Sequence, residues 1–179
     1  MPGSTRLAEP PLDAVAGGRG LVLGLLGLAL ALAVFAVWFQ WRQTRRCLAF
    51  YGADAARAIQ GAPRTELWKL AVDSASGRVV ATEQRDISSA RGLVHLRRGL
   101  VEDANFAWGS GAAGPLAPGD WDEALAFYSD PAKAPVAIVA FDLDGSGWAT
   151  VVGRAGRAPL GRLRRGLRTW IDATRATGP

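Results

Sequence analysis

The sequence has very little of the chemistry on which many metalloproteins depend, because its 179 residues include one cysteine and one histidine. One cysteine forms no internal disulfide, and it excludes zinc or iron–sulfur sites that need several thiolates. One histidine excludes sites with two imidazole ligands. Glycine and proline, with 22 and 10 residues, stay below the level typical of collagen-like or disordered chains. The sequence therefore predicts an ordinary folded domain without a metal or other cofactor.

Charge is missing from one long stretch, because no charged residue occurs between Arg19 and Arg42. This gap consists mostly of leucine, alanine and valine, and as a helix it would be roughly 33 Å long, enough to cross the hydrocarbon core of a bilayer. Trp38 and Trp41 lie at its far end, where amphipathic aromatic rings favour the headgroup layer. We predict a transmembrane helix over residues 21–41.

A cleaved signal peptide is the alternative interpretation of this run, because Ala29, Ala31 and Ala33 offer small-residue cleavage sites. However, the run is longer than the apolar region of a signal peptide, and it continues into aromatic residues and arginine. We therefore expect an uncleaved membrane anchor.

Basic residues are unevenly distributed around the predicted span. Two arginines precede it in residues 1–20, where two acidic residues accompany them, whereas four arginines and one acidic residue lie in residues 42–57. Since the flank with more basic residues tends to stay in the cytoplasm, the imbalance predicts a cytoplasmic C-terminal part. The predicted location is a bacterial inner membrane, crossed once, with the lipid bilayer as one partner.

Composition and periodicity divide the rest of the chain. Residues 1–20 contain several prolines and a Gly17-Gly18 pair, which indicates a flexible tail. Residues 42–62 place apolar side chains at helical spacing, and glycine and proline follow as stop signals, so we predict a juxtamembrane helix. This helix either continues the anchor as one long helix or is separated from it by a bend at the interface. Residues 63–179 mix strand and helix patterns and form the predicted α+β domain.

The predicted domain begins with a β-hairpin, because two strand-like stretches flank the turn-forming residues 74–77. Asp86 and the serines after it offer N-cap side chains to a helix that ends near Asp103. A second hairpin and a last helix with Pro159 in its first turn follow. The expected elements are strands 66–73 and 78–83, helix 86–103, an element 121–128 that is either helix or strand, strands 136–141 and 148–152, and a helix from 159.

A short motif occurs twice in this domain, because the Leu-Arg-Arg-Gly-Leu of residues 96–100 recurs at residues 163–167. Both copies follow a predicted hairpin, which suggests two ββα units that form one antiparallel sheet with both helices on one face. Coincidence in a chain rich in arginine and leucine is the alternative. Glycine inside a helix costs about 1 kcal/mol relative to alanine, so we expect the helices either to cross at Gly99 and Gly166 or to end before them.

Residues 142–147, Asp-Leu-Asp-Gly-Ser-Gly, resemble the start of an EF-hand calcium loop, with Asp142, Asp144 and Ser146 at ligand positions. The twelfth position is Gly153 instead of the glutamate that binds calcium through both oxygens, and the flanking segments have strand patterns. We therefore interpret this segment as a hairpin turn.

His95 and Cys47 are the other residues with potentially reactive side chains. His95 could serve as a general base for Ser88 or Ser89, but no oxyanion or strained-turn motif surrounds either serine, so we expect a solvated histidine. Cys47 follows two arginines just after the span, in a position where cysteines are sometimes acylated. We expect it to be a small hydrophobic residue that is buried or lies at the membrane interface.

Charge is segregated along the domain. Residues 66–144 carry a net charge of −5, whereas residues 154–179 carry +6. Arg162, Arg165 and Arg168 share a polar stripe of the last predicted helix, which predicts a weak surface for anionic lipid headgroups or for a partner. Nucleic acid would also attract these arginines, but the interleaved aromatic residues of a stacking platform are missing, so we expect no nucleic-acid partner.

These observations predict a single-pass membrane protein with a non-catalytic α+β domain that binds a protein partner at the membrane surface. The alternative is a membrane-tethered enzyme that uses acidic side chains such as Asp142, Asp144 and Glu102. A concave pocket with converging carboxylates would favour the enzyme, and a domain without one would favour the binding module. We expect no catalytic residues.

Overall fold

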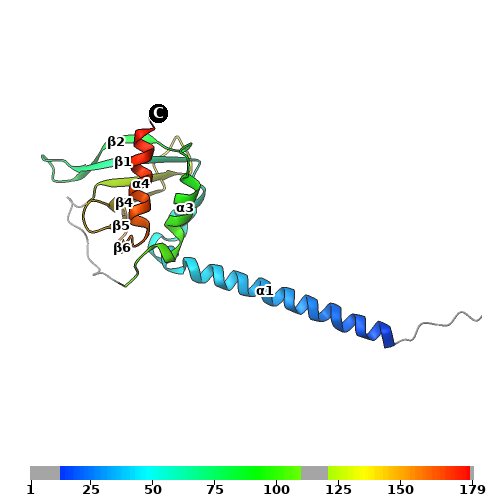
Figure 1. Ribbon diagram of the computed structural model, residues 1–179. Helices are drawn as coiled ribbons and strands as arrows, with labels where there is room; N and C mark the ends of the chain where they lie inside the picture. The colour runs from blue at the N-terminus through cyan, green and yellow to red at the C-terminus, as the bar shows by residue number, and fades with distance from the viewer. Residues whose placement is uncertain (1–12, 110–120, 178–179) are drawn as a thin grey trace, which may run out of the picture. The chain divides into compact units, whose positions relative to one another are not determined.

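The computed structural model describes residues 13–109 and 121–177 (Figure 1). The chain divides into two compact units, Met1–Arg42 and Gln43–Pro179. The first unit holds most of helix α1 (Asp13–Tyr51), and the second holds the end of that helix together with the whole α+β domain. Of the predicted flexible tail, residues 1–12 lie outside the described residues, and residues 13–20 are instead part of helix α1.

Helix α1 is the one helix in the described part of the chain that is long and apolar enough to cross a membrane. The apolar side chains between Leu21 and Trp41 are exposed, whereas the core helix of a soluble protein buries such side chains. The helix does not stop at residue 41, because it continues to Tyr51. It ends there because Gly52 has a φ of +79°, a left-handed value that favours glycine.

The segment predicted as one juxtamembrane helix over residues 42–62 is therefore two helical pieces separated by Gly52. The first is the end of α1, and the second is α2 (Ala53–Gly61). Ala55, Ala56, Ala58 and Ile59 are the buried side chains of α2. Both pieces belong to the second unit and pack into its core, so this segment is part of the folded domain.

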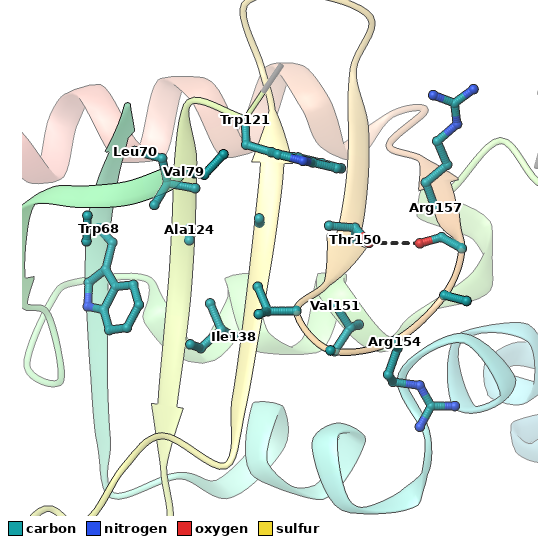
Figure 2. A pocket seen from close by; sticks show the side chains of 16 residues that line it. Trp68, Leu70, Val79, Trp121, Ala124, Ile138, Thr150, Val151, Arg154 and Arg157 are labelled. Atoms are coloured by element: carbon teal, nitrogen blue, oxygen red, sulfur yellow. Dashed lines mark hydrogen bonds between the residues drawn. The ribbon is translucent and has the colours of Figure 1, made fainter. Parts of the chain in front are cut away.

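Six antiparallel strands form one sheet in the order β2-β1-β3-β4-β5-β6. Helices α2, α3 and α4 contribute buried side chains to a core on one face of this sheet, as the helices behind the strands in Figure 2 show. The α+β fold with an antiparallel sheet, expected from the sequence, is the observed one. The strands are β1 (Arg64–Val72), β2 (Val79–Asp86), β3 (Glu123–Tyr128), β4 (Ala137–Asp142), β5 (Trp148–Val151) and β6 (Arg157–Pro159); the remaining helices are α3 (Leu93–Val101), a 3-10 turn η1 (Asp103–Asn105) and α4 (Leu163–Ala176).

Both predicted hairpins are present, as β1–β2 and β4–β5, but three local expectations need correction or completion. The undecided element is a strand, β3, and all six of its side chains are buried. Helix α3 starts at Leu93, not after Asp86, because the Asp86 carboxylate accepts hydrogen bonds from the amide and hydroxyl of Ser88 and forms a separate turn. Pro159 ends strand β6, so α4 begins four residues later than the first-turn proline predicted.

The two copies of the repeated motif lie in α3 and α4, which follow the β1–β2 and β4–β5 hairpins respectively, with β6 inserted in the second case. A Cβ on Gly99 would lie 3.5 Å from the side chain of Leu163 in α4, whereas a Cβ on Gly166 would meet nothing within 4 Å. The expectation that the helices cross at both glycines is therefore wrong. Only Gly99 faces the other helix.

Candidate functional site

The face of the sheet opposite the helices is open and largely apolar (Figure 2). Alternate side chains of a strand point to opposite faces, so in β4 Val139 and Phe141 enter the core, while Ile138 and Ala140 point away from it. A groove of about 940 Å³ follows this face across the sheet. It is lined by Trp68, Leu70, Val79, Ala81, Trp121, Ala124, Ile138, Ala140 and Thr150, and by residues 151–157 of the β5–β6 connection.

Small side chains make this face concave. Ala81, Ala124 and Ala140 line the groove from β2, β3 and β4, at positions where strands more often carry β-branched residues. The indoles of Trp68 and Trp121 lie at separate places along the groove, Trp121 across β4 and β5 and Trp68 beside β1 (Figure 2). The combination of small and large apolar side chains leaves a hydrophobic channel rather than a flat surface.

A buried carboxylate fixes one of these indoles. Glu66 is almost completely buried, and its Oε2 atom accepts hydrogen bonds from Trp68 Nε1 at 2.9 Å and from the Tyr128 hydroxyl at 2.5 Å. Arg64 pairs with the other carboxylate oxygen. Burial alone would raise the pKa of Glu66, but these hydrogen bonds and the arginine charge lower it overall. Glu66 thus positions Trp68 and is itself fully engaged.

The β5–β6 end of the groove is basic. Arg154 and Arg157 belong to its lining, and the guanidinium carbon of Arg157 lies 4.3 Å from the centroid of the Trp148 ring. The Arg154 guanidinium packs against Gly52, where any Cβ would collide with it. Gly52 is the residue directly after helix α1, so the basic end of the groove lies beside the C-terminal end of that helix.

None of the described residues that line the groove carries a carboxylate. Asp144 pairs with Arg168, and Glu102 accepts a hydrogen bond from Arg98 at 3.0 Å. Within residues 13–109 and 121–177, no three histidine, cysteine or acidic residues are grouped so that they could hold a metal ion. The acidic residues proposed for the enzyme alternative are therefore used in separate local contacts, outside the groove.

Residues 142–147 form the connection between β4 and β5, and the hairpin-turn interpretation is confirmed. Both oxygens of Asp142 accept backbone hydrogen bonds, from the amide of Gly145 at 2.7 Å and from that of Ser146 at 2.6 Å. Asp122 accepts two more, from the amides of Leu143 and Asp144. Burial raises the pKa of Asp122 despite these amides. Both carboxylates thus hold the turn together through backbone amides.

The predicted arginine surface lies on or just before α4. Arg162 and Arg165 are exposed, whereas Arg168 pairs with Asp144, whose carboxylate offsets the positive charge that this side chain adds to the surface. Arg164 is also engaged, because it donates to the carbonyls of Leu143 and Gly145. Arg165 and Arg168 share a shallow depression of about 410 Å³ with Arg164, and Arg162 lies outside it. A lipid or partner surface here stays a prediction.

The remaining candidate residues are His95, Ser88 and Cys47. His95 is exposed on α3, as expected for a solvated histidine. The Ser88 hydroxyl accepts the amide of Thr65 and donates to Asp86, so it is a turn residue rather than the predicted helix cap. Cys47 is completely buried, as predicted, and its amide donates to Asp103 at 2.7 Å.

The groove itself was not predicted from the sequence, although a signal was present. Residues 136–141 form an unbroken apolar run, and residues 124–127 form another. A strand with one solvated face alternates between apolar and polar side chains, so an unbroken run indicates that both faces avoid water. Here helices cover one face only, and the second apolar face becomes the groove.

Comparison of the chain with protein-family models, with curated proteins and with solved structures finds no significant match.

Proposed function

We propose that this protein is a single-pass membrane-anchored binding module whose α+β domain holds a partner at the membrane surface and performs no catalysis. One observation carries the proposal: the large groove on the open sheet face is apolar and has no carboxylate in its lining. Large apolar pockets with few polar groups are typical of binding sites. The acidic residues that an enzyme would need are engaged elsewhere, which favours the binding module over the tethered enzyme.

Helix α1 supports the membrane part of the proposal. Its apolar side chains are exposed, and a helix of this length and composition is stable in a bilayer. The guanidinium of Arg42 lies 5.4 Å from the centroid of the Trp38 ring, an arrangement suited to the headgroup layer. We place the protein in a bacterial inner membrane with the domain in the cytoplasm, on the strength of the basic residues after the span.

Fractionation tests this placement. The protein should stay in the membrane pellet after a carbonate wash, and its C-terminus should resist an external protease in intact spheroplasts. Release of a soluble form with a new N-terminus near residue 34 would instead establish a cleaved signal peptide. Digestion of the C-terminus in intact spheroplasts would reverse the orientation.

Site-specific photo-crosslinking in cells tests the binding function itself. A photoreactive phenylalanine analogue placed at Ile138, in the groove, should form adducts on irradiation. The same analogue at Val94, an exposed apolar residue on α3, is the matched control and should form none. The proposal fails if Ile138 gives no adduct of any kind, or if the two positions give the same adducts.

A further inference from the structure

The groove combines features that restrict the chemistry of its occupant. Its apolar lining follows the sheet from Trp68 to the β5–β6 connection, and the small alanine side chains leave room for a slender ligand. Exposed apolar patches of this kind on a folded domain mark interaction sites. Its polar groups are concentrated at one end, so the occupant should be an amphiphile with one long apolar part and one polar end.

The charge at that end is positive. Arg154 and Arg157 lie in the lining, and among the described residues no carboxylate pairs with Arg154. Arg154 is exposed, and a guanidinium favours a carboxylate or phosphate group, because its planar donors match those oxygens. The complementary occupant therefore has an anionic headgroup.

The basic end is also joined to the proposed membrane span by a short stretch of chain. Arg154 contacts Gly52, which follows Trp41 in the sequence by only eleven positions. A chain of that length reaches at most roughly 40 Å even when fully extended. The covalent connection therefore limits how far the basic end of the groove can be from the end of the apolar span, and anionic lipids are concentrated at a bilayer surface.

We infer that the groove binds a single-chain anionic lipid of the membrane in which the protein is anchored. The aliphatic chain lies along the open face of β1 to β5, between the indoles of Trp68 and Trp121. The headgroup binds at the β5–β6 end through Arg154. This assignment rests on the proposed binding function and names the chemical class of the ligand.

Photoaffinity labelling of the full chain tests the inference. The protein is reconstituted in nanodiscs of neutral phosphatidylcholine with a diazirine-bearing palmitic acid, and the matched fatty alcohol serves as the uncharged probe. After irradiation, labelled peptides are mapped by mass spectrometry. The acid should label peptides from β1 and β4, and it should do so up to about fivefold more than the alcohol, the range expected of one exposed ionic contact.

Variants separate the contributions of shape and charge. Ala140→Phe fills the groove and should abolish labelling of the groove peptides by both probes. Arg154→Gln should reduce labelling by the acid to the level of the alcohol, and Arg154→Lys should restore most of it. Arg98→Gln, which removes an exposed arginine from α3 outside the groove lining, is the matched control and should change nothing. Thermal unfolding of each variant shows that the domain is folded, and Ile138→Asn replaces Ala140→Phe if the latter does not fold.

The inference is overturned if the acid and the alcohol label the groove equally, if only α1 peptides are labelled, or if filling the groove has no effect. These outcomes are distinct from failure of the binding function. A protein adduct at Ile138 in cells, without lipid labelling in nanodiscs, would retain the binding module and reject the lipid as its ligand.

Discussion

On the helix-covered face of the sheet, Phe127 and Val139 have no exposed surface, whereas on the open face Trp68 and Ile138 remain half-buried. The covered face is occupied by aliphatic and aromatic side chains from the helices, so its apolar residues have protein partners. The open face carries a similar run of apolar residues without such partners. The covered face therefore stabilises the fold, and it is to the open face that we assign the proposed binding.

Large-to-small substitutions should separate the two faces most clearly. Phe127→Ala leaves a cavity in the core and should destabilise the domain by about 3–5 kcal/mol, the range for a buried phenylalanine. Ile138→Ala removes a half-buried side chain and should cost about 1 kcal/mol. Chemical unfolding of the full chain in mild detergent, followed by near-ultraviolet circular dichroism, measures both. Equal losses would show that the open face is a second structural core.

An ion pair on the covered face gives the next largest effect. Arg175 of α4 donates two hydrogen bonds to Glu123, at 2.6 and 2.7 Å, and the Glu123 carboxylate is nearly buried. Burial raises the pKa of Glu123, although Arg175 opposes this. Arg175→Met leaves the carboxylate without its partner, so we expect a loss of about 2 kcal/mol at pH 7, less than for a fully buried pair because Arg175 is partly exposed.

The pH dependence of this variant identifies the cause. A carboxyl whose pKa is raised in the folded state binds more protons there, so it favours folding increasingly as the pH falls through that raised value. The pKa of Glu123 rises further without Arg175, and the deficit of Arg175→Met relative to the wild type should therefore shrink between pH 7 and pH 4.5. A deficit that is constant with pH would mean that lost packing, not the unpaired charge, is responsible.

The open face has its own buried carboxylate, and its pKa shifts in the opposite direction. Glu66 has a lowered pKa, so its contribution to stability is present above its unfolded value and is lost as the pH falls through the folded one. Glu66→Gln should cost about 1–2 kcal/mol at pH 7, because Trp68 and Tyr128 lose a charged acceptor. Unfolding at pH 7 and pH 3.5 should show that the stability difference between wild type and Glu66→Gln becomes smaller, because the wild type loses stability.

The carboxylate of Glu66 also helps to raise the pKa of Tyr128 to about 12, and spectrophotometric titration should find that pKa lowered in Glu66→Gln.

The sequence predicts some of these features and not others. The apolar run before Arg42 and the alternation around residues 74–77 depend on local chemistry, so the long helix and the first hairpin were predicted correctly. The groove depends on which strands become neighbours and on which face the helices cover. Those are long-range choices, and the pairing of Trp68 with Ala124 across β1 and β3 is not visible in a local pattern.

Which residues pair with one another also depends on parts of the chain that are distant in the sequence. The spacing of Arg162, Arg165 and Arg168 along α4 follows from helix geometry, but the neutralisation of Arg168 depends on Asp144, 24 positions earlier in another element. Likewise, Pro159 has a helix-start signature, yet β6 pairs it with Trp148 and extends the sheet. Local capping signals are worth about 1 kcal/mol each, and tertiary pairing outweighs them here.

The smallest expected effect concerns the turn between β4 and β5. Both strands contribute side chains to the covered face and to the open face. An EF-hand uses carboxylate oxygens as ligands, but both oxygens of Asp142 already accept amide hydrogen bonds, and Asp144 pairs with Arg168. A bound ion would have to break these contacts, and any ion that binds the folded state must raise its stability. Millimolar calcium should therefore leave the thermal unfolding temperature of the full chain unchanged, with magnesium as the control for ionic strength. A rise specific to calcium and lost in Asp144→Ala would show that this turn is a metal site and would contradict the turn interpretation.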